Sequence, residues 1–383
     1  MPIYKMEGKK DGLQKYRVRI NYTDGGKAKQ IDRVAYGKEA AKELEIQLRS
    51  NLKPAAAKDI TLRQLYDEYV NVKRYEVREN TIRTQTERLR LYVLPELGDC
   101  RLKDLNIARM QKWKQTVEES VNSRNSSKKI SVAMKRDVYG AFRTLLNYAV
   151  RMEYIVKNPL IALGNFKNPY ELKKEMKVYT SEEFKKFITA AKKSAQRAEK
   201  EDGNTYEWNF YVFFNIAFYM GLRKGEINAL KWSDLDGCIL HVRRSIAQKL
   251  GGGDKETPPK NKTSIRDIQM PLPLTKILEQ HRKRQERMAG FSEDFRICGG
   301  ERCLRDTTLQ HRKQRYAEEA GVQPIRIHDF RHSHASLLAN NGINIQEIAR
   351  RLGHANVEIT WNIYSHLYPR EEERAIAVLN KIR

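Results

Sequence analysis

The sequence predicts a multidomain protein that is mainly α-helical with small β parts. Apolar and polar residues alternate over residues 16–22, which is the period-2 pattern of a strand with one buried face. Apolar residues then recur at helical spacing over 61–159. Proline and small residues interrupt these patterns in two segments, 51–60 and 157–179, as in linkers. We therefore expect three domains: a sheet plus helix in 1–55, helices in 60–162, and a mixed α+β fold with a C-terminal tail in 175–383.

The expected first domain combines a β-sheet with a helix. The turn sequence Asp-Gly-Gly at 24–26 allows a hairpin, and 37–52 reads as a short helix, so we expect a three-stranded sheet plus helix. One face of the strands is basic. A half-buried sheet exposes polar residues in any case, but a basic ribbon also fits a DNA major groove, and both interpretations stay open. The candidate DNA contacts of this domain are Arg17, Arg19, Lys27 and Lys29.

The expected second domain holds helices near 61–74, 79–93, 106–120 and 130–152. A polar loop separates the last two, and the stretch 121–136 holds basic residues and no acid. Such a run is usually a solvated face. Here it lies beside Ser and Asn side chains, which commonly contact phosphates, so we favour DNA contacts. The candidates are Arg124, Lys128, Lys129, Lys135 and Arg136.

Composition indicates the kind of partner. Lys and Arg total 73 against 48 Asp and Glu, a net charge of +25, which suits a polyanion such as nucleic acid. The four cysteines are too few and too scattered for a disulfide framework, and Cys298 and Cys303 lack a second pair for zinc. The most apolar run, 209–222, is too short to span a bilayer and carries two asparagines, so we expect a buried core helix. We expect a soluble, intracellular protein without a membrane partner.

Residues with catalytic potential are concentrated in the last domain. The motif "GLRKGE" carries Arg223 with Glu226 three residues on, close enough for the acid to orient the arginine. A second arginine and a histidine share a helix face in "HDFRH" at the same spacing. The other candidates lie in "NKT", in "RLGH", and ten residues later in "IYSH". The complete candidate set is Arg223, Lys262, His328, Arg331, His354 and Tyr364, supported by Glu226.

These residue types fit phosphoryl transfer without a metal. An arginine fork grips two phosphate oxygens, and two arginines can offset the charge that builds on a five-coordinate phosphorus. A phenol ionises near pH 10, so nearby cations or a proton-accepting histidine are needed to make it nucleophilic. A lysine can protonate the leaving oxygen if desolvation lowers its pKa. The set holds no carboxylate cluster for Mg²⁺, so we expect neither a metal nor another cofactor.

The order and spacing of these motifs resemble the tyrosine recombinases of the phage and conjugative-transposon integrase type. That family's pattern is an arginine, a β-hairpin lysine, His-x-x-Arg, a second histidine or tryptophan in an "LGH" turn, and a nucleophilic tyrosine about ten residues later. All six positions match. The resemblance implies an arm-type DNA-binding domain in 1–55, a core-site DNA-binding domain in 60–162, and a tyrosine-recombinase catalytic domain in 175–383.

The resemblance also implies a role for each residue. Tyr364 would attack the scissile phosphate, giving a 3′-phosphotyrosine link and a free 5′-hydroxyl, and a partner strand would reverse the step through a Holliday junction. Arg223 and Arg331 would hold the non-bridging oxygens and His354 would add a hydrogen bond. Lys262 would protonate the leaving oxygen, and His328 would manage the tyrosine proton.

The partners implied by the resemblance are two DNA duplexes and three further copies of the chain. A homotetramer would integrate and excise a mobile element in the bacterial cytoplasm, associated with the nucleoid when acting. An excisionase and a DNA-bending host factor are expected on the resemblance alone. The tail 371–383 reads as a short helix with an apolar face, which would dock either on a neighbouring protomer or on its own domain.

Three other functions explain part of the sequence. A DNA-binding regulator without catalysis would explain the charge but not the order of the six motifs. A type IB topoisomerase shares the chemistry, but the short chain and N-terminal ribbon favour a recombinase. Five histidines between 328 and 366 could suggest a metal hydrolase, yet no further ligand motif accompanies them, so His332 and His334 are expected to be helix residues near the site. Tyr368 lies four residues from Tyr364, and the spacing from "LGH" selects Tyr364.

Overall fold

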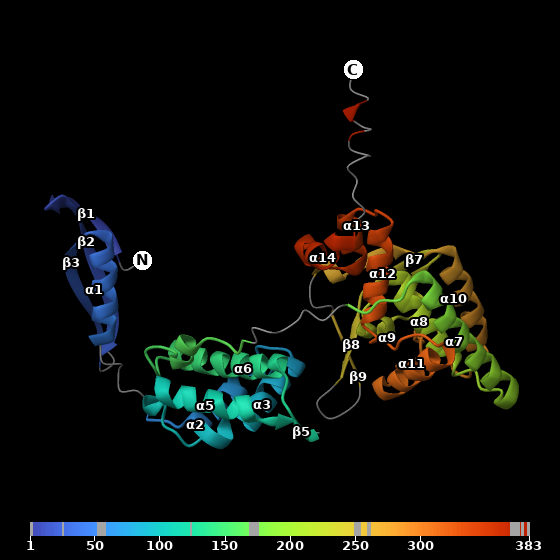
Figure 1. Ribbon diagram of the computed structural model, residues 1–383, viewed down its shortest axis with the longest axis horizontal. Helices are drawn as coiled ribbons and strands as arrows, with labels where there is room; N and C mark the ends of the chain where they lie inside the picture. Colours follow the sequence, from blue (N-terminus) through green and yellow to red (C-terminus); the bar gives the residue numbers. More distant parts are fainter. Residues whose placement is uncertain are drawn as a thin grey trace. The chain divides into compact units, whose positions relative to one another are not determined.

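The computed structural model describes residues 3–24, 27–51, 59–122, 125–167, 176–248, 254–258, 262–367, 376 and 379–380. The chain divides into two compact units, a first unit of Met1–Glu171 and a second unit of Leu172–Arg383 (Figure 1). The boundary between them falls within the segment 157–179. The finer division into three domains stays a prediction.

The first unit begins with an antiparallel sheet in the order β1-β2-β3, with one helix, α1, packed against it (Figure 1). Val18, Ile20, Ala35 and Ala41 form its small core. The alternation over 16–22 therefore places its apolar residues inward, as predicted. The elements are β1 (Ile3–Lys10), β2 (Leu13–Asp24), β3 (Lys27–Tyr36) and α1 (Lys38–Asn51).

The rest of the first unit is a group of helices around a separate apolar core. Trp113 and Phe142 meet edge to face at its centre, 4.9 Å between ring centroids. Thr61 and Gln64 form a capping box that starts the first of these helices. Four helices lie where the sequence predicted them: α2 (Leu62–Lys73), α3 (Glu79–Tyr92), α5 (Ile107–Glu119) and α6 (Val132–Arg151). The short helix α4 (Leu94–Leu97) was not predicted, and 3₁₀ turns lie at Leu102–Asp104 and Pro159–Leu163.

The segment before α6 was predicted to be a polar loop, but in the structure part of it forms a short hairpin. β4 (Val121–Asn122) pairs with β5 (Asn125–Lys129), and the backbone N–H of Ile130 donates to Ser120 O at 3.0 Å. Backbone pairing of this kind needs no apolar side chains, so the polar sequence did not reveal it.

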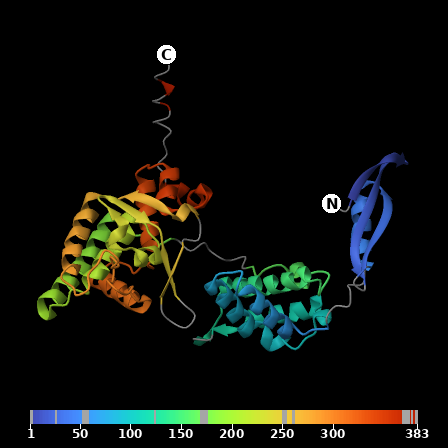
Figure 2. The same cartoon turned by 180° about the vertical axis from the view of Figure 1, so that it is seen from behind.

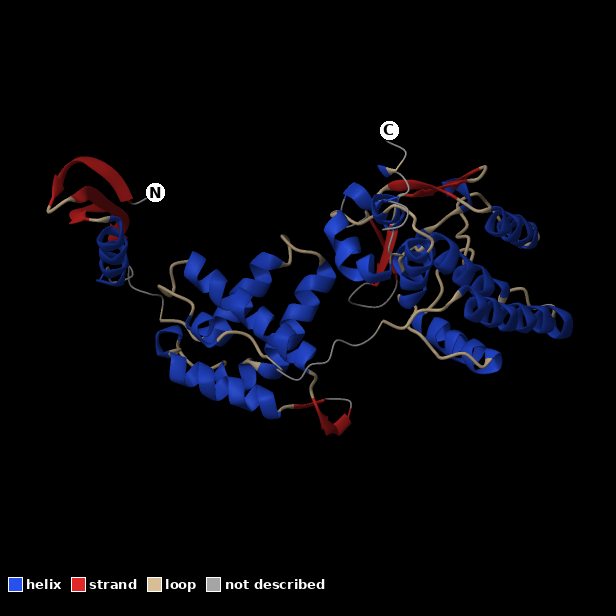
Figure 3. Cartoon of the chain, turned by 45° about the horizontal axis from the view of Figure 1, so that its top comes forward, coloured by secondary structure: helices blue, strands red, loops and turns tan. Residues whose placement is uncertain are grey.

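The second unit is mainly helical, with small strands (Figure 3). One three-stranded sheet has the order β10-β7-β6, and a separate ribbon pairs β8 with β9. The helices are α7 (Ser181–Asp202), α8 (Trp208–Met220), α9 (Lys224–Ala229), α10 (Leu272–Gln285), α11 (Asp306–Ala320), α12 (Asp329–Asn340), α13 (Ile345–Leu352) and α14 (Val357–Tyr364). The strands are β6 (Leu235–Asp236), β7 (Ile239–Val242), β8 (Ser245–Gln248), β9 (Asp254–Thr257) and β10 (Arg266–Gln269), with 3₁₀ turns at Trp232–Asp234, η4 (Lys262–Ser264) and Ser365–Leu367.

Helix α8 is the central helix of the second unit, as its apolar sequence predicted. Phe213 and Phe214 are fully buried, and Asn215 satisfies its amide within the helix by donating to Tyr211 O at 2.8 Å. Among the described residues, no helix is both long and apolar enough to cross a membrane. Figures 1 and 2 show α13 and α14 packed beside α12, so three late segments of the chain meet near the end of α8.

Of the predicted C-terminal helix 371–383, only residues 376 and 379–380 are described. The proposed docking of that tail therefore lies outside the described residues.

Candidate active site

Arg223 occupies the sharp turn between α8 and α9. Gly221 ends α8 in the left-handed region, with φ of 62°, and a Cβ there would come within 2.6 Å of the His334 ring. Only glycine fits both conditions without a shift. Arg223 then precedes α9, with its side chain 38% exposed. Its Nη1 donates to Glu226 Oε1 at 2.8 Å and its backbone N–H donates to Glu226 Oε2 at 3.0 Å.

Arg331 lies in the first turn of α12 and is almost completely buried. Its Nη1 donates to Gly221 O at 2.8 Å and its Nη2 donates to Leu352 O at 2.7 Å. The guanidinium therefore joins the end of α8 to the end of α13. Burial, and next the charge of Arg223, lower the pKa of Arg331 to about 9, which leaves it charged at neutral pH.

A carboxylate and a third arginine support Arg223. Glu226 is 2% exposed and receives Arg266 Nη2 at 2.9 Å on Oε2. Burial acts to raise the pKa of Glu226, but the charges of Arg266 and Arg223 outweigh it, and this pKa lies below its ordinary value. The predicted support of Arg223 by Glu226 is thus present as an ion pair.

Sequence reasoning missed Arg266. A signal was present, because Arg266 and Ile268 occupy alternate, buried positions of β10. An arginine on the apolar face of a strand needs buried partners.

His354 follows α13 at a second left-handed glycine, Gly353, with φ of 68°. Its Nδ1 shares a hydrogen bond of 2.8 Å with Thr360 Oγ1, and Arg223 Nη2 donates to the carbonyl of Gly353 at 3.3 Å. Burial, followed by the charges of Arg331 and Arg223, lowers the pKa of His354 to about 4. The imidazole is therefore neutral at pH 7 and can take part in hydrogen bonds without carrying a charge.

Tyr364 is the last residue of α14 and is 1% exposed. It packs among apolar side chains of α12 and α13, including Ala335, Ile348 and Leu352. Burial raises the pKa of Tyr364 above its ordinary value, although the charge of Arg331 acts in the opposite direction.

The hydrogen-bond partner of Tyr364 is His332. The phenol oxygen and His332 Nδ1 are 2.6 Å apart. Burial, then the neighbouring His328, lower the pKa of His332 to about 4, so the ring is neutral at pH 7 and can accept the phenol proton. The resemblance assigned this proton to His328, whose ring instead meets His332 edge-on, with centroids 4.9 Å apart. His334 is a structural residue, because its Nδ1 is 2.8 Å from Phe218 O.

Lys262 is the first residue of η4, immediately before β10. Its side chain lies outside the described residues.

The predicted DNA contacts of the helical part are only partly on the surface. Lys128 and Lys129 are exposed on β5, whereas Arg124 lies outside the described residues. Lys135 is a correction, because it is 7% exposed, pairs with Glu118 and donates to the carbonyl of Glu118 at 3.2 Å. Its position on the buried side of α6 removes it from the set of DNA contacts. Arg136 donates from Nε to Phe166 O at 3.1 Å.

The basic residues of the N-terminal sheet do not share one face. Arg19 is opposite Asp32 in the register and binds it through two hydrogen bonds of 2.9 and 3.0 Å. Lys29 is opposite Tyr22, which alternation places on the same face as Ile20, away from Arg17 and Arg19. Lys27 falls on the Lys29 face by register, and its side chain lies outside the described residues. Of the four candidate residues, only Arg17 and Arg19 therefore lie together on the face of the sheet away from Ile20.

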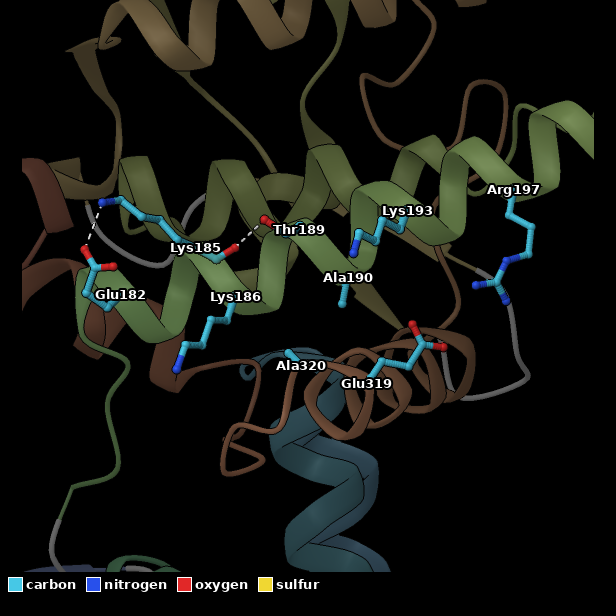
Figure 4. A pocket seen from close by; sticks show the side chains of 9 residues that line it. All are labelled: Glu182, Lys185, Lys186, Thr189, Ala190, Lys193, Arg197, Glu319 and Ala320. Atoms are coloured by element: carbon cyan, nitrogen blue, oxygen red, sulfur yellow. Dashed lines mark hydrogen bonds and ion pairs between the residues drawn. The ribbon is translucent and has the colours of Figure 1, made fainter.

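A surface groove of about 770 Å³ lies away from these residues, between α7 and the end of α11 (Figure 4). Its charged lining mixes signs, and one lysine–glutamate pair is closed at 2.8 Å. Among the side chains that the structure describes, no candidate catalytic residue lines this groove. Among the residues that the structure describes, no group of three or more His, Cys, Asp and Glu side chains is arranged to hold a metal ion. The charged lining residues are Glu182, Lys185, Lys186, Lys193, Arg197 and Glu319.

Comparison with known families decides the class of protein. Residues 177–371, more than half of the chain, match the Phage integrase family, and residues 61–117 match the Phage integrase, N-terminal SAM-like domain. The chain belongs to the phage integrase family. The family and the enzyme class predicted from the sequence, a tyrosine recombinase, are thereby confirmed.

Curated members of the phage integrase family are similar over different lengths. The ICEBs1 integrase of Bacillus subtilis is 33% identical over 236 residues, so the alignment spans 60% of this chain and 60% of that protein. The Tyrosine recombinase XerC-like protein of Caldanaerobacter subterraneus is 27% identical over 405 residues, 97% of each chain.

Solved integrase structures share the fold. The Tn1549 transposon integrase bound to transposon right end DNA aligns with a TM-score of 0.62 at 19% identity, over 84% of this chain and 99% of that one. A lambda integrase tetramer bound to a Holliday junction aligns with a TM-score of 0.54 at 17% identity, over 95% and 94%. The predicted multidomain, mainly helical fold class is therefore confirmed.

Proposed function

We propose that this chain is a site-specific DNA recombinase that cuts and rejoins DNA through a 3′-phosphotyrosine link at Tyr364. The observation that carries the proposal is the meeting of two arginines, a neutral imidazole and a hydrogen-bonded phenol where α8, α12, α13 and α14 end or begin. These groups match the needs of metal-free phosphoryl transfer in a chain of the phage integrase family.

The arginines supply the charge. Arg223 and Arg331 hold the non-bridging oxygens of the scissile phosphate, and the neutral His354 adds one hydrogen bond. Donors that are oriented before the reaction stabilise the extra negative charge of the five-coordinate transition state without reorganisation cost. Because Arg331 is fixed by two backbone carbonyls, its remaining N–H groups point in a defined direction.

The tyrosine supplies the nucleophile. The phenol oxygen attacks phosphorus, its proton passes to His332 Nδ1, and the bond from phosphorus to the 5′ oxygen breaks. The leaving oxygen takes a proton, for which Lys262 is the candidate. The phosphotyrosine ester keeps the energy of the broken bond, so the 5′-hydroxyl of a partner strand can reverse the step and join new DNA.

The related integrases support a proposal for the assembly. The lambda integrase tetramer on a Holliday junction supports a homotetramer of this chain on two duplexes. We assign the arm-type contacts to the N-terminal sheet and the core-site contacts to the helical part of the first unit. An excisionase and a DNA-bending host factor would bias the direction between integration and excision.

Covalent trapping tests the proposal. The protein is mixed in EDTA with a labelled duplex carrying the junction of the element that encodes it, and is denatured in SDS. We expect a protein–DNA adduct in the wild type and in Tyr206→Phe, an exposed tyrosine of the same unit, and none in Tyr364→Phe. Tight binding without an adduct would favour the regulator. Relaxation of supercoils without strand exchange between duplexes would favour a topoisomerase.

A further inference from the structure

Glu226 creates a problem for the proposed phosphate site. Both of its oxygens accept hydrogen bonds from Arg223, one from the guanidinium and one from the backbone. A carboxylate this close competes with a DNA phosphate for the same guanidinium. An isolated pair of Arg223 and Glu226 would be electrically neutral and would offer a dianionic transition state little attraction.

Arg266 is placed to remove that competition. It is 7% exposed, and its Nη2 and Nη1 approach the two oxygens of Glu226 at 2.9 and 3.3 Å. Two further donors are also used within the protein, since Nε donates to Arg351 O at 2.7 Å and Nη1 donates to Ser264 O at 2.9 Å. Arg266 is therefore fixed and committed to protein atoms, unlike the partly exposed Arg223.

The contacts of Arg266 also connect the segments that carry other candidate residues. Ser264 belongs to η4, which begins at Lys262, and a Cβ on Gly353 would lie 2.9 Å from Arg266 Nη1. The turn before His354 thus packs directly on the guanidinium. The two arginines and the carboxylate together carry one net positive charge, which is lost if Arg266 is removed.

We propose that Arg266 is a positioning residue that neutralises Glu226, so that Arg223 presents its positive charge and free N–H groups to the scissile phosphate. The inference rests on the proposed function and assigns Arg266 no contact with DNA. Arg266 acts through Glu226, and its effect should disappear when that carboxylate is no longer charged.

The second unit contains a matched control. Glu207 is also buried, pairs with both Arg312 and Arg315, and accepts from Tyr316 Oη at 3.0 Å. None of these partners is a candidate catalytic residue. Removing Arg312 therefore leaves a buried carboxylate with one arginine fewer, as removing Arg266 does, without changing the charge beside Arg223.

The test measures single-turnover adduct formation on a nicked duplex that traps the covalent product. The variants are Arg266→Met, Glu226→Gln, the double variant, Arg266→Lys and the control Arg312→Met. We expect Arg266→Met to slow cleavage by roughly 10- to 100-fold, less than the 10²–10³ typical of a direct oxyanion donor. Arg312→Met should lose a similar amount of thermal stability and cleave at nearly the wild-type rate.

Two results distinguish neutralisation from packing. The double variant should cleave at least about fivefold faster than Arg266→Met, because it removes the charge that Arg266 balanced. On a substrate with a neutral methyl group in place of one non-bridging oxygen, the defect of Arg266→Met should shrink, because less charge has to be balanced. Arg266→Lys, which keeps the charge, should stay within about tenfold of the wild type.

Other outcomes would overturn the inference. A double variant as slow as Arg266→Met, or an equal defect on both substrates, would mean that Arg266 serves packing alone. Equal losses in Arg266→Lys and Arg266→Met would mean that the planar fork matters and the charge does not. If Arg266→Met does not fold, the substrate comparison is made with Arg266→Gln, which also removes the charge of Arg266 and gives the comparison the same meaning. Absence of any adduct in the wild type would instead contradict the proposed function.

Discussion

The two ends of the candidate active site are built from different kinds of contact. At the arginine end, Arg223 and Arg331 are oriented by a carboxylate and by backbone carbonyls, and part of Arg223 is open to solvent. At the tyrosine end, the phenol of Tyr364 is enclosed by apolar side chains and bonded to one neutral imidazole. The charged side chains are already oriented at the arginine end, whereas the nucleophilic phenol is buried at the tyrosine end.

This difference separates two requirements of the reaction. Stabilising the transition state needs donors fixed in advance, and a rigid buried frame provides them. Attack needs the phenol oxygen to reach phosphorus, which a side chain 1% exposed cannot do until α14 shifts. Changes at the arginine end should therefore act on the chemical step, and changes at the tyrosine end should act on the nucleophile and its proton.

The largest expected effect is at the arginine end. Arg331→Lys should reduce the rate of adduct formation by about 10³-fold, because an ammonium cannot bond both Gly221 O and Leu352 O and still hold a phosphate. Single-turnover trapping measures the rate. The control is Arg350→Lys, because Arg350 forms an exposed ion pair with Glu347. A loss below about tenfold in Arg331→Lys would contradict the assigned role.

The next effect distinguishes the two histidines at the tyrosine end. His332→Gln should slow cleavage by roughly 10²-fold, because glutamine accepts a hydrogen bond but cannot take up the phenol proton. His328→Gln should cost less, since His328 meets the phenol only through His332. Rates at several pH values on the trapping duplex measure both. A larger loss of rate in His328→Gln than in His332→Gln would mean that His328 accepts the phenol proton, as the resemblance implied.

A third effect is on stability and depends on pH. The folded pKa of His332, at about 4, lies below the ordinary value near 6.5. Between these values the unfolded chain binds the proton and the folded chain does not, so the free energy of unfolding falls as pH drops from about 6.5 toward 4. In thermal unfolding, the Tm of the wild type should decrease between about pH 7.5 and pH 5. In His332→Gln this decrease should be about 2–4 °C smaller than in the wild type. His366→Gln, an exposed histidine nearby, should keep the full decrease.

The smallest effect lies outside the site. Lys128→Gln and Lys129→Gln should each reduce the slope of log affinity against log salt by about one, as expected when one lysine no longer neutralises a phosphate. Lys135→Met should leave that slope unchanged and lower the thermal stability, because Lys135 pairs inside the helical part. DNA titrations at several salt concentrations measure the slopes. If Lys135→Met changed the slope as much as Lys128→Gln does, Lys135 would have to contact a DNA phosphate.

The sequence predicted what depends on short-range patterns. Alternation predicted the sheet, helical periodicity predicted α2, α3, α5 and α6, and an apolar run predicted α8. The spacing of motifs selected Arg223, Glu226, Arg331, His354 and Tyr364, which the fold brings together.

The rest depends on contacts between distant segments. The hydrogen bond of His332 with Tyr364 joins residues 32 positions apart, and that of Arg266 with Glu226 joins residues 40 apart. Composition could not show that Lys135 is buried, because that depends on which side of α6 meets Glu118. Strand register likewise decided that Lys29 and Arg19 lie on opposite faces.

The most direct measurement is the identity of the residue joined to DNA. The trapped adduct is digested with protease and nuclease, and the peptide that carries the nucleotide is sequenced by mass spectrometry. The account predicts one modified residue, Tyr364, linked through a 3′-phosphate. A nucleotide on Tyr368, on another residue, or attached through a 5′-phosphate would contradict it.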